Sequence, residues 1–88
     1  MYTLCLPKID SNTTRNQLFN VFNRYNFGSI KKIDLITISN SKRAFIHYIN
    51  WNNNEKNKKI KEYLDDGLDI KIIYEFPWFW KCSKSKSN

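Results

Sequence analysis

Four segments of this chain show the alternation of apolar and polar positions, or the richness in β-branched side chains, that predicts a strand. They are residues 2–9, 30–38, 41–49 and 69–74. The short polar turn at 39–41 predicts that the second and third strands form a hairpin.

Two other segments show helical spacing. The apolar stripe of the first helix, which is expected to end near residue 25, is Leu18, Val21, Phe22 and Tyr25. Ser11 or Thr13 is its expected N-cap, and Gly28 is expected to take the left-handed conformation that ends it. A second, strongly basic helix is expected to follow a cap at Asn53 or Asn54 and to end near Asp65.

The resulting order, βαββαβ, is the split βαβ arrangement. We therefore expect an α+β fold of the ferredoxin-like type, a two-layer sandwich with a four-stranded antiparallel sheet and both helices on one face. The opposite face would stay open. The chain of 88 residues suffices for one domain, which we place at 1–81. Residues 82–88, rich in Ser and Lys, are expected to form a disordered basic tail.

The formal net charge of +7 at pH 7 is large for this length and predicts an acidic partner. Nucleic acid ranks first and an anionic membrane surface second, while excess lysine can also serve only solubility. No apolar run approaches the roughly 18 residues that span a bilayer, and the start of the chain lacks the pattern of a signal peptide. We therefore expect an intracellular protein with reduced thiols and no membrane partner.

Candidate chemistry is sparse. Cys5 and Cys82 lie at opposite ends of the chain without metal-binding spacing, and the chain has one histidine, so we expect no metal and no cofactor. No nucleophile accompanied by a base and no phosphate-binding loop can be recognised. The sequence therefore favours a binding protein over an enzyme.

The octamer 41–48 is the most informative segment for function. In a strand, three of its apolar side chains would face the core, namely Ala44, Ile46 and Tyr48. Three others would lie side by side on the open face, namely Arg43, Phe45 and His47. A guanidinium can bind phosphate or stack on a base, and a phenyl ring can stack on a base, so this set suits nucleic acid.

The octamer resembles the central signature of the RNA-recognition motif (RRM). Residues 44–48 match its last five positions, Ser41 and Lys42 miss the basic and glycine positions, and Arg43 stands in place of the first aromatic. Residues 4–9 fit the aliphatic positions of the RRM's first-strand hexamer, with Cys5 where a ring is usual. The resemblance covers nearly the whole chain and implies RNA binding on the open face.

Two of the three usual stacking rings are thus absent, and stacking is worth about 1–3 kcal/mol per base. Phe45 remains, and the planar Arg43 guanidinium can partly compensate. The alternative is a face covered by a tail or partner, packed against apolar side chains: Cys5, Ile36, Phe45 and Ile73.

Residues 76–80 carry four rings, too many to leave in water. Trp78 and Trp80 either extend the stacking platform or fold back onto the sheet or the helices. Together with 4–9 and 43–48, the run 77–81 resembles the small RRM-like proteins of giant nucleocytoplasmic large DNA viruses. The abundance of Asn, Lys and Ile, which have A/T-rich codons, is typical of such a source. This resemblance implies a viral protein in the host cytoplasm, in a viral factory or in the virion.

The main hypothesis is a domain that binds single-stranded RNA or DNA weakly and with low sequence specificity. The residues expected to contact it are Thr3, Cys5, Lys42, Arg43, Phe45, His47, Lys71, Ile73, Trp78, Trp80, Lys81, Lys84 and Lys86. The alternative is a degenerate RRM that acts as a protein-interaction or virion-structural module, with a homodimer formed through the Trp-rich segment.

Overall fold

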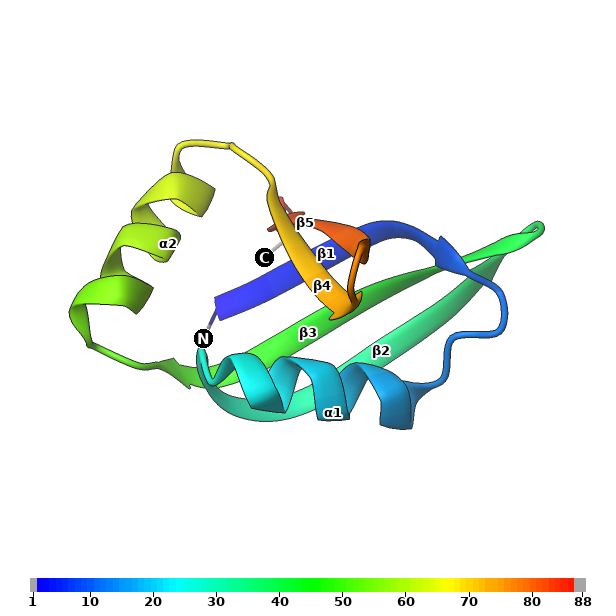
Figure 1. Cartoon of the computed structure of the whole chain (residues 1–88), viewed down its shortest axis with the longest axis horizontal. Coiled ribbons are helices and arrows are strands. Elements are labelled where there is room, and N and C mark those ends of the chain that lie inside the picture. Colours follow the sequence, from blue (N-terminus) through cyan, green and yellow to red (C-terminus); the bar gives the residue numbers. More distant parts are fainter. Residues whose placement is uncertain (1, 87–88) are drawn as a thin grey trace.

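The computed structural model describes residues 2–86. Its elements follow the order β1 (Tyr2–Asp10), α1 (Arg15–Tyr25), β2 (Gly28–Ile38), β3 (Ser41–Trp51), α2 (Glu55–Asp65), β4 (Ile70–Glu75) and β5 (Trp78–Lys84). The strands form one antiparallel sheet in the order β2-β3-β1-β5-β4, with β1 at its centre (Figure 1). The fold is therefore α+β.

The predicted four-stranded ferredoxin-like sheet is wrong, because a fifth strand lies between β1 and β4. The segment expected to be the last strand, 69–74, forms β4 at the sheet's edge instead. Trp80 and Cys82 in β5 are buried and alternate with the exposed Phe79 and Lys81, which is the pattern of a strand. Pro77 and the Ser/Lys-rich end of the chain obscured this alternation in the sequence.

The domain boundary expected at residue 81 falls inside β5. Cys82 is fully buried, Lys84 pairs with Leu4, and the Ser85 amide donates to the carbonyl of Thr3 at 2.9 Å. Residues 82–85 therefore belong to the folded unit and not to a tail. Residues 87 and 88 of the expected tail lie outside the described residues.

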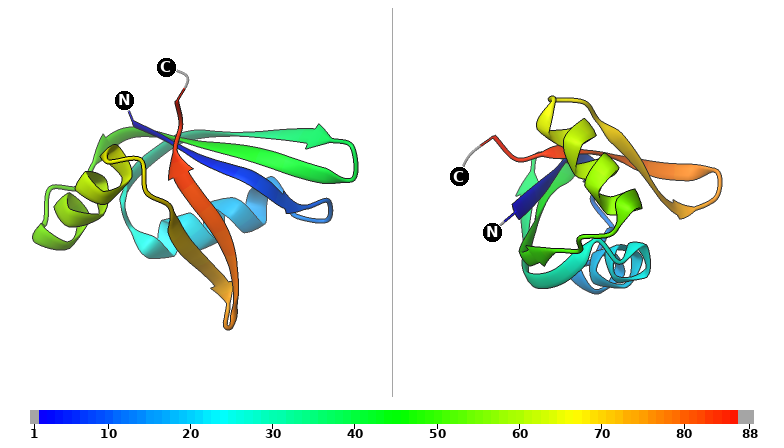
Figure 2. Two further views of the ribbon diagram at one scale, coloured as in Figure 1. Left: turned by 90° about the horizontal axis from the view of Figure 1, so that it is seen from above. Right: turned by 90° about the vertical axis from the view of Figure 1, so that its left-hand side faces the viewer.

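The hairpin of β4 and β5 bends away from the other strands. β5 pairs with β1 at Leu4↔Lys84 and Cys5↔Ser83, and the rest of the hairpin turns toward the side on which α1 lies (Figure 2). The bend brings the Trp80 ring against Phe22 of α1, with centroids 6.4 Å apart, and against Tyr74 of β4, at 4.4 Å. The hairpin thus completes the core beside α1.

Both helices begin at capping side chains. The hydroxyl of Thr14, not of Ser11 or Thr13, accepts from the Gln17 amide at 3.1 Å at the start of α1. Of the two candidate caps for α2, Asn53 and Asn54, the cap is Asn54, since its side chain accepts from the Asn57 amide at 2.8 Å.

The left-handed residue that ends α1 is Asn26, with φ 57°, and not Gly28. Gly28 serves another purpose. A Cβ at this position would collide with the carbonyl of Asn50 on β3, so the close approach of β2 to β3 requires glycine here.

The core lies between the sheet and the helices. Of the predicted apolar stripe of α1, Leu18, Val21 and Phe22 are buried and Tyr25 is partly buried, while the inward positions predicted in β3 are all buried. The other strands and α2 complete this core with Leu4, Leu6, Ile72, Trp80, Cys82 and Leu64. Trp51, which ends β3, stacks on Phe27 at 5.0 Å and donates from Nε1 to the Asn57 carbonyl at 2.8 Å. This contact ties β3 to α2.

Candidate functional site on the outer face of the sheet

The sheet face that points away from α1, here called the outer face, collects the side chains that alternate with the core positions. In the strand register, Cys5 lies opposite Phe45, and Phe45 lies opposite Asp34. The adjacent row sets Thr3 opposite His47 and His47 opposite Lys32. Thr3, Cys5, Phe45 and His47 are all partly exposed. The structure thus brings these four predicted site residues together.

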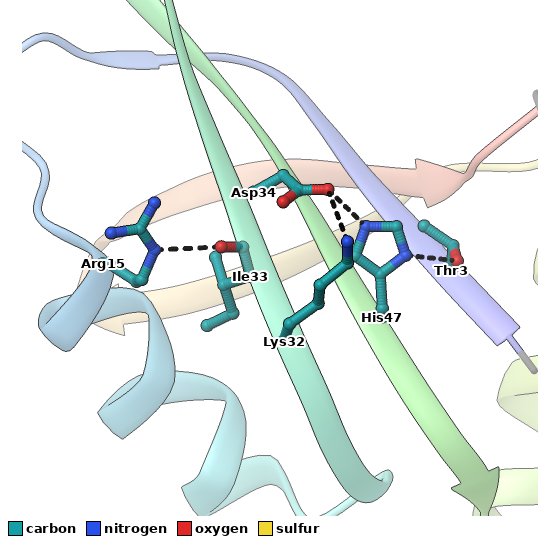
Figure 3. Close-up of polar contacts among 6 residues, drawn as sticks. All are labelled: Thr3, Arg15, Lys32, Ile33, Asp34 and His47. Carbon is teal, nitrogen blue, oxygen red and sulfur yellow. Dashed lines mark hydrogen bonds and ion pairs between the residues drawn. The ribbon is translucent and has the colours of Figure 1, made fainter.

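A chain of polar contacts crosses three strands on this face (Figure 3). The Thr3 hydroxyl lies 3.0 Å from His47 Nδ1, and His47 Nε2 lies 2.8 Å from Asp34 Oδ2. Lys32 Nζ lies 4.0 Å from the same carboxylate oxygen. A neutral imidazole satisfies both contacts when Nε2–H donates to Asp34 and Nδ1 accepts from the Thr3 hydroxyl. This chain holds the His47 ring in a fixed orientation beside Phe45.

Sequence reasoning missed Asp34 and Lys32. Both lie on β2, which the sequence did predict as a strand. Because they alternate with Ile33 and Leu35, which face the core, the sequence could have placed them on the open face. Pairing of 30–38 with the octamer would have placed a carboxylate next to Phe45.

Phe45 has Arg43 and His47 as its neighbours along β3 on the same face. Arg43 is exposed, and its Nε donates to the Pro7 carbonyl at 3.4 Å. Burial raises the pKa of the Cys5 thiol, and the nearby Arg43 charge offsets this only in part. The thiol therefore stays neutral near pH 7 and acts as a small apolar neighbour of the Phe45 ring.

The outer face continues over the β4–β5 hairpin. Lys71 pairs with Lys81, and Ile73 pairs with Phe79. Lys71 Nζ lies 4.8 Å from the centroid of the Phe79 ring, and Lys81 Nζ lies 3.6 Å from a carboxylate oxygen of Asp69. The predicted residues Lys71, Ile73 and Lys81 thus extend the face, and Phe79 adds a ring that sequence reasoning did not select.

Three predicted contact residues lie elsewhere. Trp80 is 4% exposed within the core and cannot stack on a base. Lys42 points to the same side of the sheet as Ala44, toward α1, and its Nζ donates to the Thr13 carbonyl at 3.0 Å. Lys84 points to the same side, where its Nζ lies 3.2 Å from Asp65 of α2.

Two further predicted residues lie at the margins. Trp78 is 64% exposed at the end of the β4–β5 hairpin, beside Phe76, which is 83% exposed. Lys86 is exposed and follows the last strand. The rings at 76–80 are therefore split between the core and the solvent.

No known protein family, curated protein or solved structure matches this chain. Within residues 2–86, no helix is long and apolar enough to cross a membrane. The same residues hold no cluster of three or more His, Cys, Asp or Glu side chains placed to bind a metal ion.

Proposed function

We propose that this protein binds single-stranded RNA or DNA through the outer face, weakly and with low sequence specificity. The observation that carries the proposal is the arrangement of Phe45 with Arg43 and His47 in the middle of an open sheet face. A ring beside a planar cation offers stacking surfaces for two bases, and stacking tolerates any base.

The charges of the outer face support a ligand that carries phosphates. Arg43 lies next to Phe45 along β3, Lys32 lies opposite His47 on β2, and Lys71 and Lys81 lie on the hairpin. Together with the net charge of +7, they favour a polyanion. Affinity that arises mainly from phosphate contacts falls steeply as salt rises.

Weak binding follows from the small number of rings. One of the usual stacking rings of an RRM is present, and the Asp34 carboxylate beside Phe45 opposes a phosphate. The viral source and the place in the host cytoplasm stay predictions of the resemblance.

The test is a fluorescence-anisotropy titration of short single-stranded RNA and DNA at low and physiological salt. Phe45→Ala should weaken binding, whereas Phe19→Ala, which removes a ring of 43% exposure on α1, should not. Equal binding by the parent and by Phe45→Ala would remove the outer face from the proposal.

A second candidate function is favoured by the end of the β4–β5 hairpin. Phe76, Trp78 and Phe79 are 83%, 64% and 45% exposed, and Ile73 lies beside them at 42%. Such a group of exposed apolar side chains is typical of a protein-interaction surface. A homodimer in dilute solution that dissociates on Trp78→Ala would support this function, and a monomeric parent would count against the homodimer.

A further inference from the structure

β2 is an edge strand of the sheet, and part of its backbone faces away from β3. The two-residue loop Ser39–Asn40 joins Ile38 to its partner Ser41. The pair that closes such a hairpin is hydrogen-bonded, and hydrogen-bonded and non-hydrogen-bonded pairs then alternate. Ile33, Leu35 and Thr37 therefore direct their N–H and C=O groups to the free edge. The Ile33 carbonyl confirms this direction, because it accepts from Arg15 Nε of α1 at 2.9 Å (Figure 3).

The opposite edge of the sheet differs in this respect. At β4, the Tyr25 hydroxyl of α1 accepts from the Ile73 amide at 2.7 Å and donates to the Ile73 carbonyl at 3.4 Å, so both backbone groups of this edge residue have a partner. At β2, Arg15 covers one carbonyl, and no described strand lies beyond Leu35 and Thr37. The β2 edge is therefore the better template for a further strand.

A groove of about 640 Å³ opens between α1 and this edge. Phe19, 43% exposed, and Ile30 give it an apolar lining. Three cations surround this lining, Arg15, Lys31 and Lys32, and none of the residues that line the groove is acidic.

The charge decides between possible occupants. A second copy of this chain would present the same basic groove, with Arg15, Lys31 and Lys32 and no acidic lining residue to match them, so charge does not favour self-pairing at this site. An acidic segment gains from the same lysines.

We propose that the β2 edge and the adjoining groove bind an extended, acidic segment of a partner protein, which adds to the sheet as a sixth strand. Its backbone pairs with Leu35 and Thr37. An apolar side chain of the partner packs on Phe19, and its carboxylates lie beside Arg15 and Lys31. From Ile30 to Thr37 the strand spans roughly 23 Å, which suits a segment of about eight residues. This surface adjoins the outer face at Lys32, but the proposal does not depend on nucleic-acid binding.

The proposal is tested with the full chain and a synthetic peptide of about eight residues that alternates glutamate and valine. Amide NMR shifts of Leu35 and Thr37 report binding at the edge. The control peptide carries lysine in place of glutamate. We expect the glutamate peptide to shift both amides and the lysine peptide to shift neither. Equal effects of both peptides, or no effect of the glutamate peptide, would overturn the proposal.

Two variants of one exposed position separate backbone pairing from side-chain contact. Thr37→Pro removes an N–H that faces solvent, which an edge strand tolerates, whereas Thr37→Val keeps it. Proline should weaken peptide binding about threefold or more, and valine should leave it unchanged. Phe19→Ala and Lys31→Glu, both on the surface, should weaken it as well. Peptide binding that none of these changes alters would place the peptide elsewhere.

Two other occupants give distinct results in the same experiments. A homodimer that Thr37→Pro dissociates in sedimentation velocity would assign the edge to a second copy. A single-stranded oligonucleotide that shifts the amide signals of Leu35 and Thr37, and not those of Cys5 and Phe45, would assign the β2 edge to nucleic acid. Either result would overturn the proposal. Both proposed surfaces would be supported if nucleic acid shifts the amide signals of Cys5 and Phe45 while the glutamate peptide shifts those of Leu35 and Thr37.

Discussion

His47 Nε2 of β3 lies 2.8 Å from the Asp34 carboxylate of β2, on the face that we propose for a polyanion. The carboxylate fixes the imidazole beside Phe45, and it also sets a negative charge where phosphates would approach. The two roles oppose each other, and a substitution that removes only the charge can separate them.

Asp34→Asn should strengthen binding of single-stranded nucleic acid about two- to threefold at low salt. The asparagine can still accept from His47, while the repulsion of a phosphate within several ångströms is lost. Anisotropy titrations of Asp34→Asn and of Glu62→Gln, an exposed acid on α2, measure the effect at equal change in net charge. Equal gains in both variants would mean that net charge, and not the outer face, sets affinity.

Trp80 and Trp78 should differ sharply in their contribution to stability. Trp80→Ala removes a ring that is 4% exposed and stacked on Phe22 and Tyr74, so it should lower the free energy of unfolding by about 3–5 kcal/mol. Trp78→Ala, at 64% exposure, should change it by less than about 0.5 kcal/mol. Urea unfolding followed by circular dichroism measures both, and similar losses would contradict the burial of Trp80.

Tyr48 carries a buried hydroxyl without a hydrogen-bond partner in the described structure, and burial raises the pKa of this phenol. Tyr48→Phe removes the unsatisfied group and keeps the ring, which packs edge-on against Trp51. We expect the free energy of unfolding to rise by up to about 1 kcal/mol. Tyr2→Phe is the contrasting variant, because the Tyr2 hydroxyl donates to Asp65 at 2.8 Å and its loss should destabilise. A marked loss of stability in Tyr48→Phe would reveal a partner for its hydroxyl.

Asp65 ties α2 to both ends of the chain. Burial acts to raise the pKa of Asp65, but hydrogen bonds from Tyr2, Lys61 and Lys84 outweigh it and lower the pKa. Because the folded pKa lies below the unfolded one, the contribution is present above about pH 4 and is lost as pH falls through the lowered value. The site is partly exposed, so the contribution should be less than about 1 kcal/mol.

The check is thermal unfolding of the parent and of Asp65→Asn between neutral and strongly acidic pH. The two should differ at neutral pH and converge in acid. A difference that persists in acid would mean that packing, and not ionisation, accounts for the effect.

The strands and helices up to residue 74 followed from local patterns, since Leu4 and Leu6 alternate and Leu18, Val21 and Phe22 keep helical spacing. The alternation of the octamer likewise placed Phe45 and His47 on one face with Cys5. These features depend only on the period of each element.

What the sequence concealed depends on tertiary structure. Whether Trp80 packs inward depends on the bend of the hairpin toward Phe22, which no local pattern encodes. The contacts of Asp34 required the register of β2 against β3. The sequence predicted four strands and the structure has five, because the turn at Phe76–Pro77 joins β4 to β5. The proline was expected to follow the last strand of the sheet.

The most direct test of the central claim is the affinity of single-stranded RNA and DNA for the parent, Phe45→Ala, Arg43→Ala and the control Phe19→Ala, measured at low and physiological salt. We predict binding that weakens steeply with salt. We also predict a loss of about fivefold or more in Phe45→Ala, a smaller loss in Arg43→Ala, and none in Phe19→Ala. Absence of binding at low salt, or equal affinity in the parent and Phe45→Ala, would contradict a nucleic-acid site on the outer face.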